Sequence, residues 1–418
     1  MKYIHRVAWT GSRPGLERIT ALLHELGDPQ DSLRFVHVAG TNGKGSFCSM
    51  LDSVLRKAGF KTGLYTSPYI ERFNERMAVD GEPISDTELS EITARVRVFA
   101  DKMADPPTEF ELITAIAMEY FFRNGCDIVV LEVGMGGELD STNVIDSPEA
   151  AVICAIDLDH TSFLGNTVEE VAHAKAGIIK GGTTAVLYEA LPSVTKVFEN
   201  RCRNVGAELV KADFSSLCNI RHTLTQTVFD CEKYKDVSLS LVGSYQPYNA
   251  FVAISTIEVL RKKGYDISDA ALYEGLACVR WPGRFEILGE NPVFVLDGAH
   301  NPHGMRAAVE SFRAHFGDRK IHFVVGAMAD KDVSGMMAML LPLADEFVAV
   351  KPDNPRAMEA DELAGLLTEL GARAEKCDGI DEAVKLVLSR AGDDGIVACL
   401  GSLYFSAEIR RAYLKLRG

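Results

Sequence analysis

Short apolar runs rich in β-branched residues alternate along the first half of the chain with segments whose apolar residues recur at helical spacing. This alternation favours βαβ units, in which parallel strands are joined by helices that cover the sheet. The pattern predicts strands at residues 35–40, 61–65, 127–133, 150–156 and 183–188. It predicts helices at about 44–58, 86–103, 109–123 and 167–176. We therefore expect a mostly parallel sheet in this half.

The pattern changes near residue 208. From there to residue 243, Thr, Val, Ser and Leu alternate in a way typical of antiparallel strands at the edge of a sheet. Helical periodicity returns at about 246–263 and 268–278. Trp281-Pro282-Gly283 is then a turn-forming break, which we interpret as the approach to an interdomain linker.

A second alternating block follows, with apolar runs at 292–297, 321–326, 346–351 and 395–401 separated by helical segments. At 418 residues the chain exceeds what one hydrophobic core usually serves. We therefore expect an α/β protein of two domains. The boundaries that follow from these breaks are 1–283 for the larger domain, 284–291 for the linker and 292–418 for the smaller domain.

Composition narrows the classes of partner. An apolar fraction of 47% and a charged fraction of 25% are typical of a globular chain, so no large disordered part is expected. The formal net charge is 44 − 59 = −15. A surface this acidic repels phosphate backbones and anionic lipid, which argues against nucleic acid and membranes as partners. A phosphate ligand must therefore meet a local pocket of backbone N–H groups, lysine or metal.

Nine cysteines are scattered along the chain and never form CxxC. Cys154 and Cys399 lie inside apolar runs, where a thiol behaves as a small hydrophobe. The pattern argues for a reducing compartment and against a zinc cluster. The first residues lack the apolar region of a signal peptide and no run approaches a membrane span, so we expect a cytoplasmic protein.

The strongest chemical signal follows the first predicted strand and reads GTNGKGS, residues 40–46. Its three glycines let the backbone turn tightly and point N–H groups inward, while Lys44 supplies a positive charge at the start of a helix. These features together favour binding of a triphosphate. The loop departs from the strict P-loop pattern, which needs glycine at Val38 and a hydroxyl at Gly45. Here the hydroxyl falls one place later, at Ser46.

Other polar residues follow the neighbouring predicted strands. They are Ser67 after the second strand, Glu132 at the end of the third, and Asp157, Asp159 and His160 after the fourth. Because ligands bind beyond the carboxyl ends of parallel strands, these groups are expected to gather around the phosphate loop. Glu132 is the best candidate for a magnesium ligand, with a salt bridge or a helix cap as the alternative. His160 alone is a weak candidate, because imidazole is an unusual magnesium ligand.

Two further positions are ambiguous from their neighbours alone. Lys175, in AHAKAGIIK, is expected to be a solvated lysine on the surface of a helix. Asp297 and His300 follow a predicted strand of the second domain and could contact a nucleotide or an incoming nucleophile. An Asx-type cap before a helix that starts near Pro302 explains that motif equally well.

Taken together, these residues resemble one family: folylpolyglutamate synthase and its bifunctional form with dihydrofolate synthase activity, within the Mur ligase superfamily. Eight motifs occur in order along nearly the whole chain, which makes the resemblance specific. They are HVAGTNGKGS (37–46), GLYTSPYIERFNERM (63–77), FELITAIA (110–117), LEVGMGGELDSTNV (131–144), DHTSFLGNTVEEVAHAKAGIIK (159–180), WPGRFEIL (281–288), LDGAHNPHG (296–304) and GSLYFSAEIR (401–410).

The resemblance implies a P-loop ATPase domain joined to a Rossmann-like C-terminal domain, with the active site in the cleft. It implies magnesium ligation by Ser67, Glu132 and His160. It also implies that a set of residues binds the nucleotide: Gly40, Thr41, Asn42, Gly43, Lys44, Gly45, Ser46, Asn249, Arg284 and Asp297.

The resemblance makes Lys175 a lysine that is carried as a carbamate and can hold a second magnesium ion, contrary to the reading from its neighbours. His300 is similar to a family position near the reacting centre, so Lys44, Lys175 and His300 are the implied catalytic residues. The implied cofactors are ATP and one or two Mg²⁺ ions, with room for a monovalent cation such as K⁺.

The implied reaction is ATP-dependent amide formation between L-glutamate and a folate through an acyl phosphate, which releases ADP and phosphate. The chain is expected to act as a monomer on small molecules. Dihydropteroate stays open as a second substrate, since the segment Ser12–Arg18 that could hold the pterin fits neither subtype decisively. Other Mur-type amino-acid ligases are the alternative within this class. A nucleotide switch or a simple kinase is the alternative outside it, although no Asn is followed by Lys, so the NKxD motif is absent.

Overall fold

The computed structural model of the chain describes residues 3–4, 13–159 and 161–417. The chain divides into two compact units. Unit 1 comprises residues 1–217 and 248–279, and unit 2 comprises residues 218–247 and 280–418. No helix in the described ranges is both long enough and apolar enough to span a membrane.

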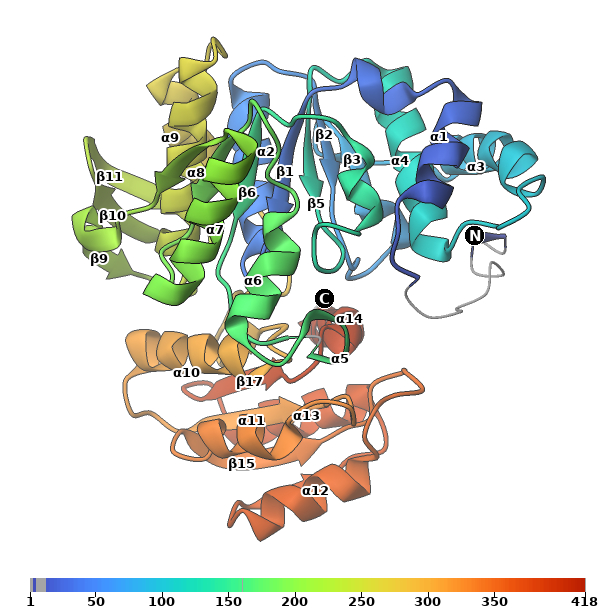
Figure 1. The fold of residues 1–418 in the computed structure, drawn as a ribbon. Helices are drawn as coiled ribbons and strands as arrows, with labels where there is room; N and C mark the ends of the chain where they lie inside the picture. The colour runs from blue at the N-terminus through green and yellow to red at the C-terminus, as the bar shows by residue number, and fades with distance from the viewer. Residues whose placement is uncertain (1–2, 5–12, 160, 418) are drawn as a thin grey trace. The chain divides into compact units, whose positions relative to one another are not determined.

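Unit 1 is built on an eight-stranded sheet in the order β4-β3-β2-β5-β1-β6-β7-β8 (Figure 1). The six strands from β2 to β8 in that order are parallel, whereas β3 and β4 are antiparallel at one edge. Their bounds are β1 Phe35–Ala39, β2 Thr62–Tyr65, β3 Met77–Val79, β4 Glu82–Pro83, β5 Ile128–Glu132, β6 Ala150–Ile153, β7 Thr184–Leu187 and β8 Glu208–Lys211. The mostly parallel sheet predicted from the sequence is confirmed.

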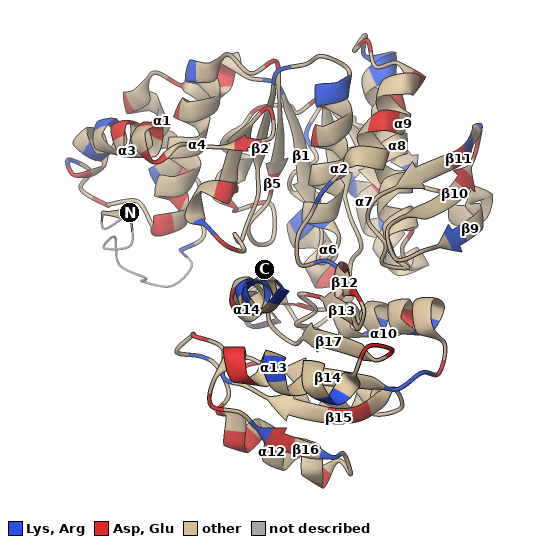
Figure 2. Ribbon diagram, turned by 180° about the vertical axis from the view of Figure 1, so that it is seen from behind, with Lys and Arg blue, Asp and Glu red and all other residues tan. Residues whose placement is uncertain are grey.

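Helices cover both faces of this sheet because β1, β5, β6 and β7 are buried along their whole length. The bounds are α1 Glu17–Leu26, α2 Lys44–Lys57, α3 Asp86–Ala100, α4 Glu109–Asn124, α5 Thr161–Leu164, α6 Val168–Ala176, α7 Pro192–Val205, α8 Gln246–Lys262 and α9 Asp269–Cys278. One face packs against α1, α3 and α4 at one end and against α6 and α7 at the other. The opposite face carries α2, which also packs on α9 (Figure 2).

Unit 2 contains two sheets. The larger has the order β12-β13-β17-β14-β15-β16, in which only β12 is antiparallel to its neighbour. Its strands are β12 Glu286–Glu290, β13 Val293–Leu296, β14 Ile321–Val325, β15 Ala344–Ala349, β16 Ala374–Lys376 and β17 Ile396–Leu400. Its helices are α10 Pro302–Phe316, α11 Val333–Leu340, α12 Ala360–Glu369, α13 Ile380–Ala391 and α14 Ser406–Arg417. The prediction of a second, smaller α/β domain in the C-terminal part of the chain is therefore confirmed.

The smaller sheet of unit 2 is antiparallel, with the order β11-β10-β9. Its strands are β9 Cys218–His222, β10 Thr227–Cys231 and β11 Tyr234–Leu239. The antiparallel pattern predicted for 208–243 is thus confirmed for these strands, which form a sheet of their own. Alternate residues of β10 are buried, which gives this sheet a buried face of its own, while β8 extends the main sheet in parallel.

The predicted linker is partly a strand, and it is not the first place where the chain passes from one unit to the other. Residues 286–290 of the segment 284–291 form β12, which pairs with β13. The chain also passes between the units earlier, since residues 218–247 belong to unit 2 and α8 runs on into unit 1.

Two imidazoles in unit 2 lie against each other where the smaller sheet meets α10. The ring centroids of His222, at the end of β9, and His315, on α10, are 4.9 Å apart. Nδ1 of His315 donates to the carbonyl of Ser311 at 2.8 Å, and the ring also lies 5.1 Å from that of Phe285. Burial lowers the pKa of both histidines, and the charge of His315 lowers the pKa of His222 further, whereas the backbone hydrogen bond to Ser311 acts against the shift of His315. Protonation of either ring is therefore disfavoured in the folded protein.

We predict that His315→Phe flattens the acid limb of the stability curve. A histidine whose folded pKa is below its unfolded value binds more protons when unfolded, so its stability contribution is present above about pH 6.5 and is lost as the pH falls below that value. Phenylalanine keeps the aromatic packing without titrating. Denaturant unfolding at pH 7, 6 and 5 should show a smaller decline for His315→Phe than for the wild type. The exposed His173→Gln is the control, and a decline equal to that of the wild type in both variants would contradict the prediction.

Candidate active site

The phosphate loop connects the end of β1 at Ala39 to the start of α2 at Lys44. Gly40 and Gly43 have φ values of +156° and +85°. Both glycines are also required by close packing: a Cβ on Gly40 would lie 2.7 Å from Cβ of Cys154, and a Cβ on Gly43 would lie 2.6 Å from Oδ1 of Asn249. Conformation and space together explain why glycine stands at these two positions.

The loop is fastened to the segment after β6. The N–H groups of Thr41 and Asn42 donate to the carbonyl of Ala155 at 2.8 and 3.3 Å. The Thr41 hydroxyl donates to the carbonyl of Asp157 at 2.8 Å and accepts the Asp157 N–H at 3.1 Å. These bonds fix the first half of the loop while its second half opens into a helix N-terminus, the arrangement that binds phosphate groups.

Two side chains complete the immediate surroundings of the loop. Lys44 donates from Nζ to the carbonyls of Gly40 and Thr41 at 3.0 and 3.2 Å, so its charge lies over the loop backbone. Asn249, on α8, is buried against Gly43. The structure therefore brings Asn249 to the loop, about 200 residues away in sequence, and its predicted nucleotide contact stays a prediction with this support.

Glu132 ends β5 beside the phosphate-loop strand, where it pairs in register with Val38. Its side chain is only 3% exposed, and its Oε2 accepts the N–H of Ser67 at 3.2 Å. A buried carboxylate next to a hydroxyl-bearing residue is a donor set that suits a hard divalent cation such as magnesium. Ser67 and Glu132 thus lie together as predicted. His160 lies outside the described residues.

Lys175 is not the solvated lysine that its neighbours suggest. It is 5% exposed in the last turn of α6, and its Nζ donates to the carbonyl of Gly40 at 2.9 Å. Burial and then the charge of Lys44 lower the pKa of Lys175 to about 7, against the opposing effect of the carboxylates of Asp159 and Asp140. Near pH 7 the Lys175 amine beside the phosphate loop is therefore divided between its neutral and protonated forms.

In unit 2, Asp297 follows β13 and is buried. Oδ2 accepts the Phe285 N–H at 2.7 Å and the Tyr245 hydroxyl at 3.3 Å, while Oδ1 accepts the Ala299 N–H at 2.8 Å. Burial raises the pKa of Asp297, and the guanidinium of Arg284 opposes that shift. Asp297 and Arg284 therefore lie close together, with a backbone turn folded around the carboxylate.

His300 belongs to the same loop. Its Nδ1 lies 2.7 Å from the carbonyl of Gly298, which can only accept, so Nδ1 carries the proton. The cap of α10 is Asn301, whose Oδ1 accepts the Gly304 N–H at 2.7 Å. The capping role considered for Asp297 is thus filled by Asn301. Arg284, Asp297 and His300 gather at the carboxyl end of β13.

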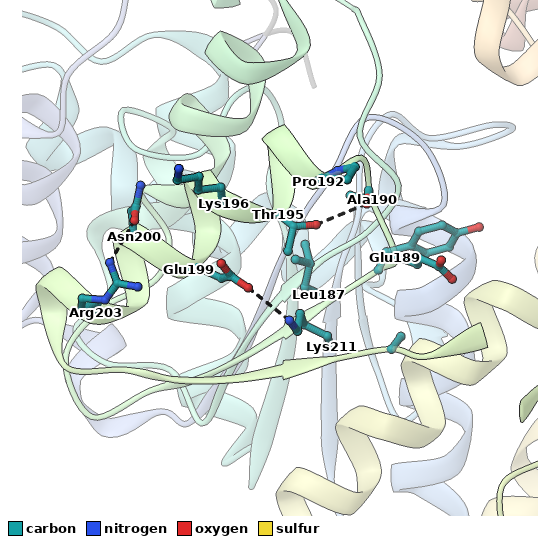
Figure 3. A pocket seen from close by; sticks show the side chains of 12 residues that line it. Leu187, Glu189, Ala190, Pro192, Thr195, Lys196, Glu199, Asn200, Arg203 and Lys211 are labelled. Carbon is teal, nitrogen blue, oxygen red and sulfur yellow. Dashed lines mark hydrogen bonds and ion pairs between the residues drawn. The ribbon is translucent and has the colours of Figure 1, made fainter. Parts of the chain in front are cut away.

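A cavity of about 520 Å³ lies elsewhere in unit 1, beyond the carboxyl ends of β7 and β8 (Figure 3). Its rim pairs Lys211 with Glu199 at 3.1 Å and Arg203 with Asn200 at 3.1 Å. None of the residues predicted for the site lines it. The converging polar groups of the candidate site lie instead around β1 and β5.

The sequence prediction omits three buried polar residues next to this site. His37 lies within β1, and its Nε2 is 2.9 Å from the hydroxyl of Thr142, which donates to Asp140 at 2.6 Å. The signal was a histidine inside an otherwise apolar strand, since a polar group in such a place requires a partner.

Comparison with known proteins places these features in one family. Residues 38–257 match the Mur ligase middle domain, and residues 283–403 match the Mur ligase glutamate ligase domain. A dihydrofolate synthase/folylpolyglutamate synthase of Bacillus subtilis is 38% identical, over 98% of this chain and 97% of its own length.

Solved structures agree over the same span. The chain is similar to Mycobacterium tuberculosis folylpolyglutamate synthase complexed with ADP, with a TM-score of 0.90, 29% identity, and coverage of 99% of this chain and 97% of that one. It is similar to Escherichia coli FolC in complex with DHPP and ADP, with a TM-score of 0.89, 29% identity, and coverage of 100% and 97%.

We predict that Lys175→Met stabilises the protein at pH 7. An amine with a folded pKa near 7 and an unfolded pKa near 10.5 is destabilising when protonated, and stability rises as the pH increases from 7 to 10.5. Removing the amine should therefore add about 3 kcal/mol at pH 7, after the lost hydrogen bond to Gly40 is deducted. The gain should disappear near pH 10. Denaturant unfolding measures it, and the exposed Lys196→Met should change stability by less than about 0.5 kcal/mol. A loss of stability at pH 7 in bicarbonate-free buffer would refute the argument.

Proposed function

The chain belongs to the folylpolyglutamate synthase and dihydrofolate synthase family of Mur ligases, and from this premise we propose that it joins L-glutamate to a folate-type carboxylic acid with hydrolysis of ATP. The observation that carries the proposal is the match to both Mur ligase domains, together with a relative 38% identical over 98% of the chain. The phosphate loop, the buried Glu132 and the loop around Asp297 all lie within those matched ranges.

The chemistry follows from the low reactivity of a carboxylate toward an amine. An oxygen of the folate carboxylate attacks the γ-phosphorus of ATP, the bond to the β,γ-bridging oxygen breaks, and ADP leaves. The amine nitrogen of glutamate then attacks the acyl carbon, loses a proton, and inorganic phosphate departs with the electrons of the broken C–O bond. The protein contributes chiefly positioning and charge neutralisation in such a transfer.

Residues of both units have roles in this scheme. Residues 40–46 hold the phosphates through backbone N–H groups, and Lys44 balances the charge that shifts onto the leaving oxygen. Asn249, Arg284 and Asp297 contact the rest of the nucleotide. We assign His300 to the reacting centre, where its Nε2, the acceptor nitrogen fixed by the Nδ1–H bond to Gly298, can take the proton of the attacking amine.

Magnesium fits the donors that the structure holds near the loop. Ser67 and Glu132 would bind it, together with His160, and the ion would neutralise negative charge on the phosphates. The bond from the Ser67 N–H to Glu132 orients that carboxylate toward such a role.

Lys175 fits a carbamate. Its amine is held beside the phosphate loop by the bond to Gly40, and a carbamate there would offer two oxygens to a second magnesium ion. The stability comparison with Lys175→Met distinguishes the two states: with bicarbonate and magnesium present, the gain expected for the bare amine should shrink or reverse.

The cysteines bear on the compartment in which the enzyme works. All nine cysteines lie in described parts of the chain and none forms a disulfide, which supports a reducing, cytoplasmic compartment. We propose that the chain acts as a monomer on its small-molecule substrates, which are ATP, L-glutamate and the folate acid.

We predict that phosphate release requires a folate acid and L-glutamate together. The assay should compare tetrahydrofolate with dihydropteroate, since the Bacillus subtilis relative bears the names of both activities. A kinase would form ADP without glutamate, and a nucleotide switch would hydrolyse ATP with neither substrate. Either of those results, in a folded preparation that binds ATP, would overturn the proposed function.

We predict that Gly43→Ala lowers ADP affinity while Gly59→Ala does not. The two glycines flank α2 and have similar φ values of +85° and +90°, but only Gly43 lacks space for a Cβ. Both substitutions should cost about 1–2 kcal/mol of stability from the backbone conformation. Gly43→Ala should in addition weaken ADP binding at least about tenfold, because the loop N–H groups must shift. Calorimetric titration measures both, and equal affinities for the two variants would contradict the assignment of the loop.

A further inference from the structure

A buried histidine lies in the strand that leads into the phosphate loop. His37 is fully buried in β1, three residues before Gly40. Burial lowers the pKa of His37 to about 3, so the ring is neutral at any working pH. A neutral imidazole in an apolar strand is costly unless it makes a hydrogen bond that the fold needs.

The direction of the hydrogen bonds around His37 follows from counting protons. The Asp140 carboxylate can only accept hydrogen bonds, and the hydroxyl oxygen of Thr142 lies 2.6 Å from its Oδ1. The single hydroxyl proton of Thr142 is therefore donated to Asp140. Nε2 of His37, 2.9 Å from the same hydroxyl oxygen, must therefore donate to it. Nδ1 is then the unprotonated nitrogen, and it is buried with no hydrogen-bond partner among the described residues. In the described part of the chain, the hydrogen bond to Thr142 therefore fixes the orientation of the ring.

Asp140 links Thr142 to the loop after β5 through hydrogen bonds. Its Oδ2 accepts the Met135 N–H at 2.8 Å, and its Oδ1 also accepts the Thr142 N–H at 3.0 Å. One carboxylate thus accepts hydrogen bonds from the first and the last residue of the segment 135–142, which holds the two ends close together. Thr142 itself lies in the 3-10 helix η4 (Ser141–Val144) and is fully buried.

The same loop packs directly on the turn of α6 that carries Lys175. The Glu138 N–H donates to the carbonyl of Ala174 at 2.8 Å. Gly137 lies so close that a Cβ on it would be 3.0 Å from Cα of Lys175. A Cβ on Gly177 would in turn be 2.2 Å from Cβ of Glu138. A shift of this loop must therefore move Lys175.

The contacts close into a ring. Lys175 reaches back to the carbonyl of Gly40, which directly follows the strand that holds His37. The path runs from His37 through Thr142, Asp140 and the loop to Lys175 and returns to Gly40. The side-chain hydrogen bonds of His37, Thr142, Asp140 and Lys175 in it are buried or partly buried.

We propose that His37 and Thr142 are positioning residues, whose hydrogen bond fixes Lys175 against the phosphate loop and thereby sets the rate of the ligase reaction. The proposal deepens the function proposed above and rests on it for the rate. Its structural half, that this bond holds the Lys175 turn in place, is tested independently of any activity.

The sharpest test is Thr142→Val, which keeps the shape of the side chain and removes the hydroxyl. Thr256→Val is the matched control, because Thr256 is equally buried and its hydroxyl bonds only within α8, to Val252 at 2.8 Å. Thr142→Val should lower kcat by about 10- to 100-fold through misplacement of Lys175, with ADP affinity within about twofold of the wild type. Hydrogen–deuterium exchange should be faster in peptides covering 134–144 and 168–177, and unchanged there in Thr256→Val.

Substitutions that keep the hydrogen-bonding group in place can distinguish a positioning role of His37 and Thr142 from a role in packing alone. The amide nitrogen of Gln can stand where Nε2 of histidine stands, whereas that of Asn stands nearer Nδ1, which makes no bond. His37→Gln should therefore keep more of kcat than His37→Asn, and Thr142→Ser more than Thr142→Val. The His37 pair serves the same purpose if Thr142→Val does not fold.

The outcomes are distinguishable. If the wild type shows no glutamate-dependent phosphate release, the proposed function fails, and the exchange data alone decide the structural half. If the wild type is active but Thr142→Val matches Thr256→Val in both kcat and exchange, the positioning role is wrong. The same conclusion follows if His37→Asn is as active as His37→Gln.

Discussion

Two lysine side chains share one backbone carbonyl, and the candidate site depends on that arrangement. The oxygen of Gly40 accepts Nζ of Lys44 at 3.0 Å and Nζ of Lys175 at 2.9 Å. Two full positive charges so close together repel strongly where water is excluded. Burial and the charge of Lys44 both lower the pKa of Lys175, so the pair carries less than two charges near pH 7. Because the pKa of Lys175 is near 7, the charge of this lysine pair can change when anionic phosphates bind or when a carbamate forms.

This local balance is the opposite of the charge outside. The chain has a net charge of −15, and acidic and basic residues are interspersed along the ribbon of both units (Figure 2). A nucleotide that is repelled by such a surface must be held by short-range contacts. The loop offers backbone N–H groups and Lys44 for this purpose, and the buried carboxylate of Glu132 on β5 suits a magnesium ion. Global charge therefore argues against extended polyanions as ligands while leaving a small, deeply bound triphosphate favourable.

Contiguous features were predictable from the sequence, and features made by distant segments were not. The phosphate loop follows from one stretch of seven residues, and the parallel strands follow from their apolar runs. Strands β9–β11 form a separate sheet because of the surface that their buried face meets, and β12 forms because it pairs with β13. Neither contact can be read from the local sequence pattern. Lys175 lies between these cases. Val171 precedes it by four residues and is buried, so helical spacing places Lys175 on the inner face of α6.

The same reasoning explains why the carboxylates were easier to find than their roles. Glu132 and Asp297 end apolar runs, which marks them in the sequence, and both are buried and accept backbone N–H groups in the structure. Asp140 does the same from within a loop. Burial raises the pKa of Asp140 and Asp297, and the N–H donors act against that shift, as the guanidinium of Arg284 does for Asp297. Each carboxylate thus loses its solvation but fixes the shape of a loop. The loop around Asp297 carries His300, and the loop around Asp140 packs against the turn of α6 that carries Lys175. The cost in stability is consistent with a site selected for geometry rather than for the most stable fold.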